Sequence, residues 1–398
     1  AQALEHAERA KARGLQQLLW QSSASLGVAG EAGTDYEDLL SDWPGHTAAV
    51  EYFLGGSHAW VLAINSDGDV RAQIIEDVNG QPIPSRELVF RVQQVISRID
   101  GLGPTEGRRL ALRAGASQPL DFNNQWQHSL NELYRILLPA NIMADLRRAE
   151  TVVVVPHHIL HYVPFAALVT EIDANTVATK MPLPKFLVEE PFNLVNAPSL
   201  SIWRTLRREA VRPLNSVRAL GVGDFAGLAS PLPGVSKELS HLREVFNDRL
   251  VETVTGQNVT KPNVLRLLQE QGLLVLATHG QKSPERPLES YVLCRGETGG
   301  IDRLTAAELY TTDVNADLIV LDACYGGFAD ASPMPGDDLF GIQRGLLQAG
   351  ARTVVAGLWD IYDATAPDIM HDFYRGLAAG ASSGGSLAND QRAFLQRW

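Results

Sequence analysis

The chain has 398 residues, of which 45% are hydrophobic and 20% are charged, and its formal net charge is −12. This length predicts two or three structural units rather than one hydrophobic core. The negative charge disfavours a nucleic-acid enzyme, because a phosphate backbone would be repelled and no segment clusters Lys and Arg with aromatic residues. No apolar run is long enough for a membrane span and none resembles a signal peptide, so we expect no membrane contact.

The first 35 residues are predicted to form a helical segment. Apolar residues recur at helical spacing along residues 2–20, with charged residues on the opposite side. They are Ala3, Leu4, Ala7, Ala10, Leu15 and Leu18. A lone helix cannot bury such a stripe, so this one either packs on the following domain or ends a helical array upstream. The first residue is Ala1 instead of Met, as it would be in a piece of a longer protein.

Residues 36–212 are predicted to form an amino-terminal α/β region. Between Ala48 and Glu76, two turns separate three segments that are rich in β-branched and aromatic residues, which is typical of a meander of strands. Helical spacing follows over residues 87–99 and 126–138. Thr151–Val155 is a short apolar run of the kind that forms a strand buried on both faces.

Residues 213–398 are predicted to form a second α/β region, in which apolar runs alternate with helical segments. The apolar runs are Ala219–Val222, Leu273–Ala277, Leu318–Leu321 and Thr353–Leu358, and the helical segments are 236–247, 262–270 and 338–349. Strands that alternate with helices predict right-handed βαβ crossovers and a mostly parallel sheet flanked by helices.

Two of these predicted strands end in residues that can carry chemistry. His279 follows the second strand, and Cys324 follows the third. Reactive groups gather beyond the carboxyl ends of parallel strands, and a single crossover separates these two, so we expect both residues at the same edge of the sheet. A thiol is nucleophilic as the thiolate, and a nearby imidazole can take or hold its proton.

The glycines near these strand ends also have a mechanistic interpretation. The backbone N–H groups of Gly280 and Cys324 are predicted to stabilise an oxyanion. Gly326 and Gly327 would allow the tight turn that presents the thiol.

Structural interpretations remain open for the same residues. A Cys at the end of an apolar strand is most often a small buried hydrophobe, and a lone His after a strand is more often structural. The occurrence of both at neighbouring strand ends, each followed by glycine, puts the catalytic interpretation on an equal footing. Cys294, the only other cysteine, lacks this setting and is expected to be inert. Two cysteines are too few for a disulfide framework, so we expect reduced thiols and a cytoplasmic location.

An ordered set of motifs resembles the CHAT domain, a caspase-like peptidase domain that is often attached to tetratricopeptide repeats. The opening residues ALEHAERAKARGLQQLL are similar to the repeat helix that precedes such domains. No single motif is specific, but their order is, and together they span most of the chain. In order they are Val155-Pro156, Leu160–Leu168, Leu232–Gly234, Ala277–Gly280, Leu304–Leu309, Leu318–Cys324 and Gly345–Trp359, followed by Asp363 and Thr365.

The resemblance implies that His279 and Cys324 form a catalytic dyad, that residues 213–398 are the catalytic caspase-like region, and that residues 36–212 are an inactive pseudo-caspase half. One position departs from the family. Its members usually carry Ser two residues before the Cys, whereas this chain has Asp322. The same Asp occurs in metacaspases, where it lines the pocket for a basic residue before the scissile bond.

A partly buried carboxylate favours a Lys or Arg side chain over a neutral one, so Asp322 predicts cleavage after a basic residue. A hydrogen-bonded structural carboxylate is the alternative. Trp359, Asp360 and Asp363 follow the next strand, where they are expected to complete the substrate wall. Core packing of Trp359 and helix capping by Asp363 are equally consistent.

Three other motifs are set aside. Ser382 lies in a Gly-x-Ser-x-Gly pattern like that of serine hydrolases, but the pattern follows a helix and no His comes after it. Gly221-Val-Gly223 is better explained as a turn than as a dinucleotide site. His157, His158 and His161 have no acidic or Cys ligand at the usual spacing. We therefore predict no metal and no cofactor.

The sequence thus predicts a cysteine endopeptidase that cleaves a protein substrate after Arg or Lys. The family resemblance further implies a regulated bacterial effector in defence or cell death, activated by a sensor or partner protein. The alternative is a non-catalytic scaffold in which the dyad is vestigial and the chain binds a protein partner.

Overall fold

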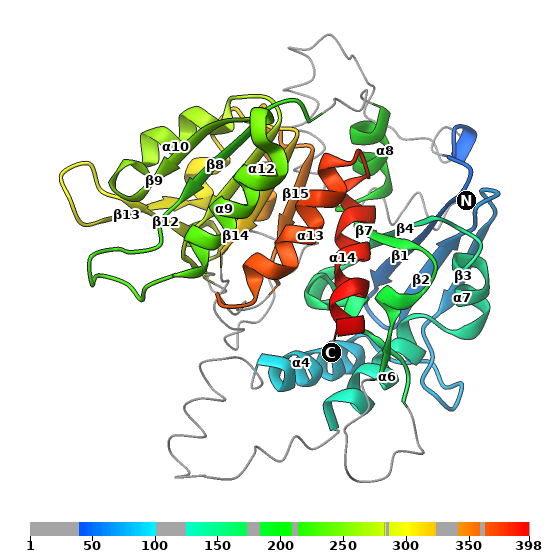
Figure 1. Ribbon diagram of the computed structural model, residues 1–398. Coiled ribbons are helices and arrows are strands. Elements are labelled where there is room, and N and C mark those ends of the chain that lie inside the picture. Colours follow the sequence, from blue (N-terminus) through cyan, green and yellow to red (C-terminus); the bar gives the residue numbers. More distant parts are fainter. Residues whose placement is uncertain are drawn as a thin grey trace. The chain divides into compact units, whose positions relative to one another are not determined.

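The structure is a computed structural model that describes residues 40–100, 125–172, 184–208, 214–281, 283, 286–323, 341–358 and 363–397. The helix predicted over residues 2–20 lies outside these ranges. The chain divides into two compact units, whose described parts are residues 40–208 and residues 214–397 (Figure 1). Both contain a sheet flanked by helices, so the predicted α/β class is confirmed.

The first unit is built on a five-stranded sheet with the order β3-β2-β1-β4-β7. The predicted meander is confirmed as three antiparallel strands, and β4 and β7 continue the sheet in parallel with β1. Four of the five residues of β4 are buried, as expected for an inner strand that is covered on both faces. The strands are β1 (Thr47–Leu54), β2 (Ala59–Ile64), β3 (Val70–Ile74), β4 (Thr151–Val155) and β7 (Asn193–Asn196).

Helices and short turns cover this sheet, and the two helices predicted here are confirmed as α4 and α6. Tyr52 of β1 is buried and donates a hydrogen bond to the carbonyl of Leu137 at 3.0 Å, which ties the sheet to the end of α6. The elements are α4 (Ser85–Asp100), α6 (Gln125–Leu137), α7 (Ala140–Leu146), α8 (Leu200–Arg208), the 3-10 turns η1 (His158–Tyr162), η2 (Phe165–Ala167) and η3 (Leu187–Glu189), and the hairpin β5 (Val169–Glu171) and β6 (Lys185–Phe186).

The second unit has a parallel sheet with the order β15-β14-β10-β8-β9. All four predicted strands are present, with ends within two residues of those expected. The edge strand β9 was not predicted, because its sequence LVETVT is polar and only one of its side chains is buried. The strands are β8 (Val217–Gly221), β9 (Leu250–Thr255), β10 (Leu273–Ala277), β14 (Leu318–Asp322) and β15 (Thr353–Ala356).

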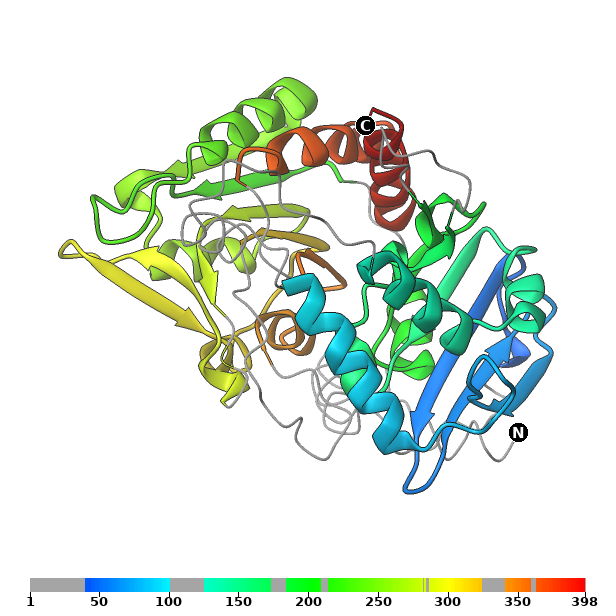
Figure 2. The ribbon, with the colours of Figure 1, turned by 90° about the horizontal axis from the view of Figure 1, so that it is seen from below.

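Helices cover both faces of this sheet (Figure 2). Alternate residues of β10 belong to two cores: Leu273 and Val275 pack toward α9 and α13, whereas Leu274 and Leu276 pack toward α10, α11 and α12. Continuous apolar strands are therefore required at the centre of the unit. The helices are α9 (Gly234–Phe246), α10 (Lys261–Leu268), α11 (Ala306–Leu309), α12 (Ile342–Gln348), α13 (Ala366–Ala378) and α14 (Ser383–Arg397), joined by the 3-10 turns η4 (Asn247–Arg249), η5 (Gly256–Asn258) and η6 (Pro287–Glu289).

The Gly-x-Ser-x-Gly motif lies at the start of α14. Ser382 Oγ accepts a hydrogen bond from the backbone N–H of Gly385 at 3.1 Å. Ser382 thus caps a helix, which is a structural use of a hydroxyl at this position.

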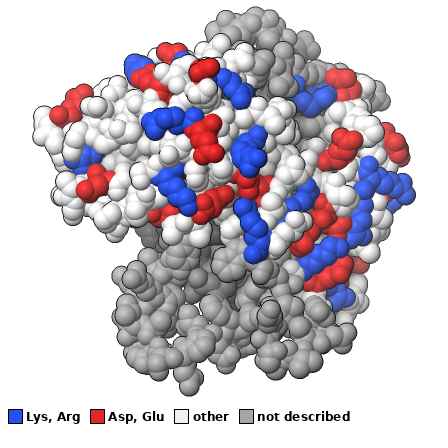
Figure 3. All heavy atoms as spheres, in the orientation of Figure 1, with Lys and Arg blue, Asp and Glu red and all other residues white. Residues whose placement is uncertain are grey.

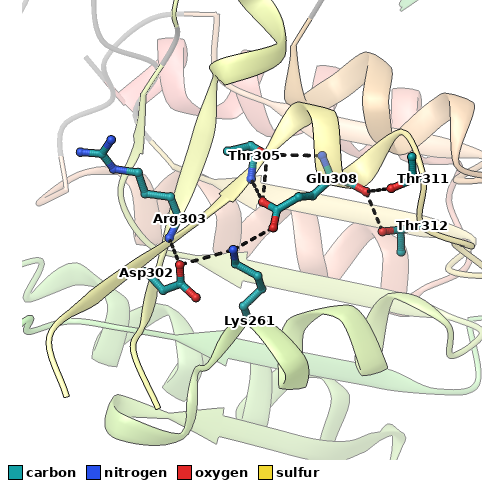
Figure 4. Close-up of polar contacts among 7 residues, drawn as sticks. All are labelled: Lys261, Asp302, Arg303, Thr305, Glu308, Thr311 and Thr312. Carbon is teal, nitrogen blue, oxygen red and sulfur yellow. Dashed lines mark hydrogen bonds and ion pairs between the residues drawn. The ribbon is translucent and has the colours of Figure 1, made fainter. Parts of the chain in front are cut away.

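A small antiparallel sheet leaves the carboxyl end of β10 directly. Its strands are β11 (Gly280–Gln281), β12 (Tyr291–Arg295) and β13 (Ile301–Thr305). At the end of β13, Thr305 and Glu308 form a capping box that begins α11 (Figure 4). The N–H of Glu308 donates to Thr305 Oγ1 at 3.3 Å, and the N–H of Thr305 donates to Glu308 Oε2 at 2.9 Å. Lys261 of α10 lies 2.8 Å from Glu308 and 3.3 Å from Asp302. These contacts join α10, β13 and α11, and they explain why the sequence motif Leu304–Leu309 is part of the fold.

Charged side chains of both signs are interspersed on the face drawn in Figure 3. Among the helices that the structure describes, none combines the length and the apolar character needed to cross a membrane.

We predict that replacing Thr305 with Ala lowers the free energy of unfolding by about 1 kcal/mol, because the first turn of α11 loses its cap. Thr311→Ala is the matched control: its exposed hydroxyl donates to the carbonyl of Glu308 at the other end of the same helix, and we expect a change within about 0.5 kcal/mol. Denaturant unfolding of both variants measures the difference. Equal effects of the two substitutions would contradict a role for the capping box.

Candidate active site

The ends of β8, β10 and β14 meet at one edge of the second sheet. Ala277 is in register with Gly221 on one side and with Asp322 on the other, and the backbone N–H of Thr278 donates to the carbonyl of Asp322 at 3.1 Å. His279 follows Ala277 by two residues, and Cys324 follows Asp322 by two. Residues 324–340 and 359–362 are outside the described ranges. They include Cys324, Gly326, Gly327, Trp359 and Asp360.

His279 is partly exposed, and one hydrogen bond fixes its ring. Nε2 lies 2.7 Å from the carbonyl oxygen of Ser230. Because a carbonyl can only accept, Nε2 carries the hydrogen and the lone pair of the neutral ring is on Nδ1. The ring of the buried Phe225 lies 5.8 Å from that of His279 and covers one side of it. His279 is thus held in the tautomer that leaves Nδ1 available as a base.

The backbone of His279 is held by the small sheet. Its carbonyl accepts from the N–H of Leu293 at 2.8 Å, and the hydroxyl of the buried Thr278 donates to the carbonyl of Leu293 at 2.9 Å. Gly280 opens β11 and pairs with Val292. The role of its amide as an oxyanion donor stays a prediction.

The loop between β8 and α9 carries Ser230. The N–H of Leu232 donates to the carbonyl of Gly223 at 2.7 Å, which closes the loop at its base. A Cβ on Gly221 would lie 2.7 Å from Val235 and 2.8 Å from Leu239, both on α9. The glycines of this segment therefore allow α9 to approach the sheet, which supports the interpretation of Gly221-Val-Gly223 as structural.

A group of acidic side chains lies beside the strand ends. Asp322, the last residue of β14, is partly buried, and Glu238 of α9 is fully buried. Tyr374 of α13 is also fully buried, and its hydroxyl donates to Glu238 Oε1 at 2.5 Å. Burial raises the pKa of Glu238 well above its ordinary value, and the charges of Asp322 and Asp363 add to the effect. Burial, and secondarily Asp363, also raises the pKa of Asp322.

Asp363 is bound to the first turn of α9. Its Oδ2 accepts a hydrogen bond from the N–H of Gly234 at 2.8 Å. A Cβ on Gly234 would press against the Asp363 carbonyl and lie 2.8 Å from its Oδ1, so only glycine allows this approach. Asp363 thus caps the start of α9, which agrees with the structural alternative of helix capping. The capped helix is distant from Asp363 in the sequence. Contact of Asp363 with a substrate stays a prediction.

Glu238 and Tyr374 were not predicted as site residues. Glu238 interrupts the apolar stripe formed by Val235, Leu239 and Leu242 on α9. A carboxylate at such a position is a signal in the sequence, because a buried acid requires a partner. That partner could not be identified before α13 and β14 were placed beside α9.

The comparisons with known proteins agree with this geometry. Residues 127–397 match the family model of the CHAT domain. The chain belongs to the CHAT domain family. The matched range contains His279, Asp322 and Cys324, and the recognition made from the ordered motifs is confirmed. The comparison with curated proteins found no match to this chain.

The solved structures similar to this CHAT chain include separase and a cysteine proteinase. Two separase–securin complexes of Saccharomyces cerevisiae match with a TM-score of 0.55 and 10% identity, over 94% and 90% of this chain. The chain spans only 32% and 30% of the separase chains. The Arg-specific cysteine proteinase gingipain R matches with a TM-score of 0.39 and 12% identity, over 70% of this chain and 65% of its own. The separase likeness confirms the caspase-like fold.

We predict that Cys294 does not react in the folded protein. Its side chain is fully buried, and burial raises the pKa of its thiol to about 12. In the Cys324→Ala variant Cys294 is the single remaining cysteine, and we expect iodoacetamide at about pH 8 to leave it unmodified until denaturant is added. Mass spectrometry of the intact protein measures the modification. Rapid alkylation of the folded variant would show that Cys294 is accessible.

Proposed function

We propose that this CHAT domain is a cysteine endopeptidase that cleaves a protein substrate after Arg or Lys, with Cys324 as nucleophile and His279 as base. The observation that carries the proposal is the fixed ring of His279, whose Nε2 is bound to Ser230 at the sheet edge where β14 also ends. A base must be oriented by a third group to activate a nucleophile, and the Ser230 carbonyl supplies that orientation.

The steps follow from these roles. Nδ1 of His279 takes the thiol proton, and Cys324 Sγ forms a bond to the peptide carbonyl carbon. The oxyanion is held by the N–H groups of Gly280 and Cys324. As the intermediate collapses, the C–N bond breaks and His279 protonates the leaving amine. Water then cleaves the thioester, which releases the acid and restores the thiol.

Asp322 supports the preference for a basic residue. Its carboxyl is the last polar group of β14 and lies two residues before the nucleophile, and it is partly exposed. A Lys or Arg side chain would pair with this carboxylate, whereas a neutral side chain would leave it uncompensated.

We also propose that a protein partner controls the activity. The separase structures similar to this chain are complexes with securin. The family resemblance extends this to a bacterial effector in defence or cell death that stays inactive until a sensor or partner rearranges it.

Replacing Cys324 with Ala is expected to lower peptide cleavage by at least about 10³-fold, because the nucleophile is lost. An activated peptide electrophile should label the wild type and fail to label this variant. Cys294→Ala is the matched control and should still be labelled. If no condition or partner allows labelling of the wild type, the protein is the non-catalytic scaffold and the endopeptidase proposal is wrong.

Replacing Asp322 with Ala is expected to remove most of the preference for a basic residue. The measurement is the ratio of kcat/KM for two peptides that differ only in Arg or citrulline before the scissile bond. Because both peptides use the same nucleophile and base, pH effects on the chemical step divide out of this ratio. In the wild type it should fall as pH is lowered, at higher pH than for an ordinary Asp, because the pKa of Asp322 is raised and protonation removes the charge. An unchanged ratio in Asp322→Ala would contradict the pocket.

A further inference from the structure

Glu238 is an acidic residue on the apolar face of α9. None of its side chain is exposed, and its neighbours on the stripe, Val235, Leu239 and Leu242, pack on the core between α9 and the sheet. An ionised carboxylate that is buried without a partner strongly destabilises the folded state, so this group must be neutral or fully hydrogen-bonded. A buried acid on a core-facing side of a helix therefore suggests a specific role.

The two oxygens of Glu238 have different surroundings. Oε1 accepts the hydroxyl hydrogen of Tyr374. Oε2 is buried and receives no hydrogen from any N–H or O–H of the described residues. Leu318 and Val320 of β14 pack in one core with α9, and strand alternation puts Asp322 on that same face, beside Glu238. The two carboxyls interact there as hydrogen-bond partners. Two carboxylates cannot form a hydrogen bond with each other, so this contact requires one proton between Glu238 and Asp322.

The surroundings decide which residue holds the proton. Glu238 is fully buried, whereas Asp322 is partly exposed at the end of β14. Asp363, bound to the start of α9, adds a negative charge near both. Burial raises the pKa of Glu238 well above its ordinary value, and the hydrogen bond between the two carboxyls opposes the rise of the Asp322 pKa. Full burial of Glu238 and partial exposure of Asp322 favour the proton on Glu238 and the negative charge on Asp322.

We propose that Glu238 is a positioning residue for substrate recognition: as a neutral carboxylic acid it donates a hydrogen bond to Asp322, accepts one from Tyr374, and so holds the Asp322 carboxylate ionised and oriented toward a basic substrate side chain. The inference rests on the proposed function, because it takes Asp322 to be the group that binds the basic residue. The chain Tyr374, Glu238, Asp322 joins α13 and α9 to the end of β14.

The experiment compares three variants with the wild type by the ratio of kcat/KM for the Arg and citrulline peptides. Glu238→Gln keeps a neutral donor for Asp322 and an acceptor for Tyr374, so the ratio should stay within about threefold of the wild type. The double variant Glu238→Leu/Tyr374→Phe removes the donor to Asp322, and it also removes the Tyr374 hydroxyl, which would otherwise stay buried without its acceptor. We expect its ratio to fall by about tenfold or more, through a lower kcat/KM for the Arg peptide. Asp322→Ala is the reference for complete loss.

Two results would overturn the inference. A ratio in the double variant equal to that of the wild type would make Glu238 purely structural. A ratio in Glu238→Gln as low as in Asp322→Ala would show that Glu238 acts through a negative charge. If the double variant does not fold, the single variant Tyr374→Phe replaces it in the test. An unchanged ratio in Tyr374→Phe also overturns the inference.

Infrared spectroscopy separates this inference from the proposed function. At neutral pH the infrared difference spectrum between the wild type and Glu238→Gln should show the C=O stretch of a protonated carboxylic acid. The subtraction removes the band of Asp390, a second carboxyl whose pKa burial raises to about 7. Absence of the band from the difference spectrum overturns the neutral acid whatever the peptidase activity. If the band is present but the wild type does not distinguish Arg from citrulline, the specificity proposal fails, and with it the positioning role.

Discussion

The parallel pairing of β10 with β14 is the constraint on which the site depends. All five residues of β10 are buried, and each large apolar side chain removed from water contributes about 1.5–3 kcal/mol. The pairing fixes Ala277 opposite Asp322, so the segments that carry His279 and Cys324 leave the sheet at the same level. A slip of one residue would turn the apolar side chains of β14 toward the wrong core. Core packing thereby sets the register of the two strands from which the His279 and Cys324 segments continue.

The same sheet edge brings together groups that are costly to bury. Glu238, Asp322 and Tyr374 lie near the core that α9 and α13 share, where every polar atom needs a partner. The Tyr374 hydroxyl, and the proton that we infer between the two carboxyls, reduce that cost without introducing a cation. A Lys or Arg in this position would pair with the acids permanently. Among the described residues, the hydrogen bonds and charges that act on Glu238 and Asp322 come from Tyr374, Asp363 and each other. In the proposed function, the basic side chain of the substrate is the cation that Asp322 binds.

The parallel core could be predicted from the sequence because its strands are buried on both faces. Such strands are short continuous apolar runs, a pattern that is easy to recognise. It did not predict β9, whose polar alternation resembles a loop, or the small sheet of β11, β12 and β13, whose short strands lack a clear period. His279 could be recognised from its position after a strand, but its Ser230 partner is a backbone carbonyl, which no sequence pattern marks. Glu238 stands out in the sequence as an acid on an apolar stripe. Its partners could not be predicted, because they come from α13 and β14.

The contact between Gly234 and Asp363 connects the start of α9 to the acidic residues beside it. Asp363 binds the first N–H of α9, and the missing side chain of Gly234 permits the approach. The first turn of a helix carries a partial positive charge, so its contact with the Asp363 carboxyl is electrostatically favourable. The negative charge of Asp363 raises the pKa values of both Glu238 and Asp322, in addition to the effect of burial. The group bound at the start of α9 therefore acts on the protonation of the acidic pair. In the proposed recognition of a basic residue, α9 would act through its terminus as well as through Glu238.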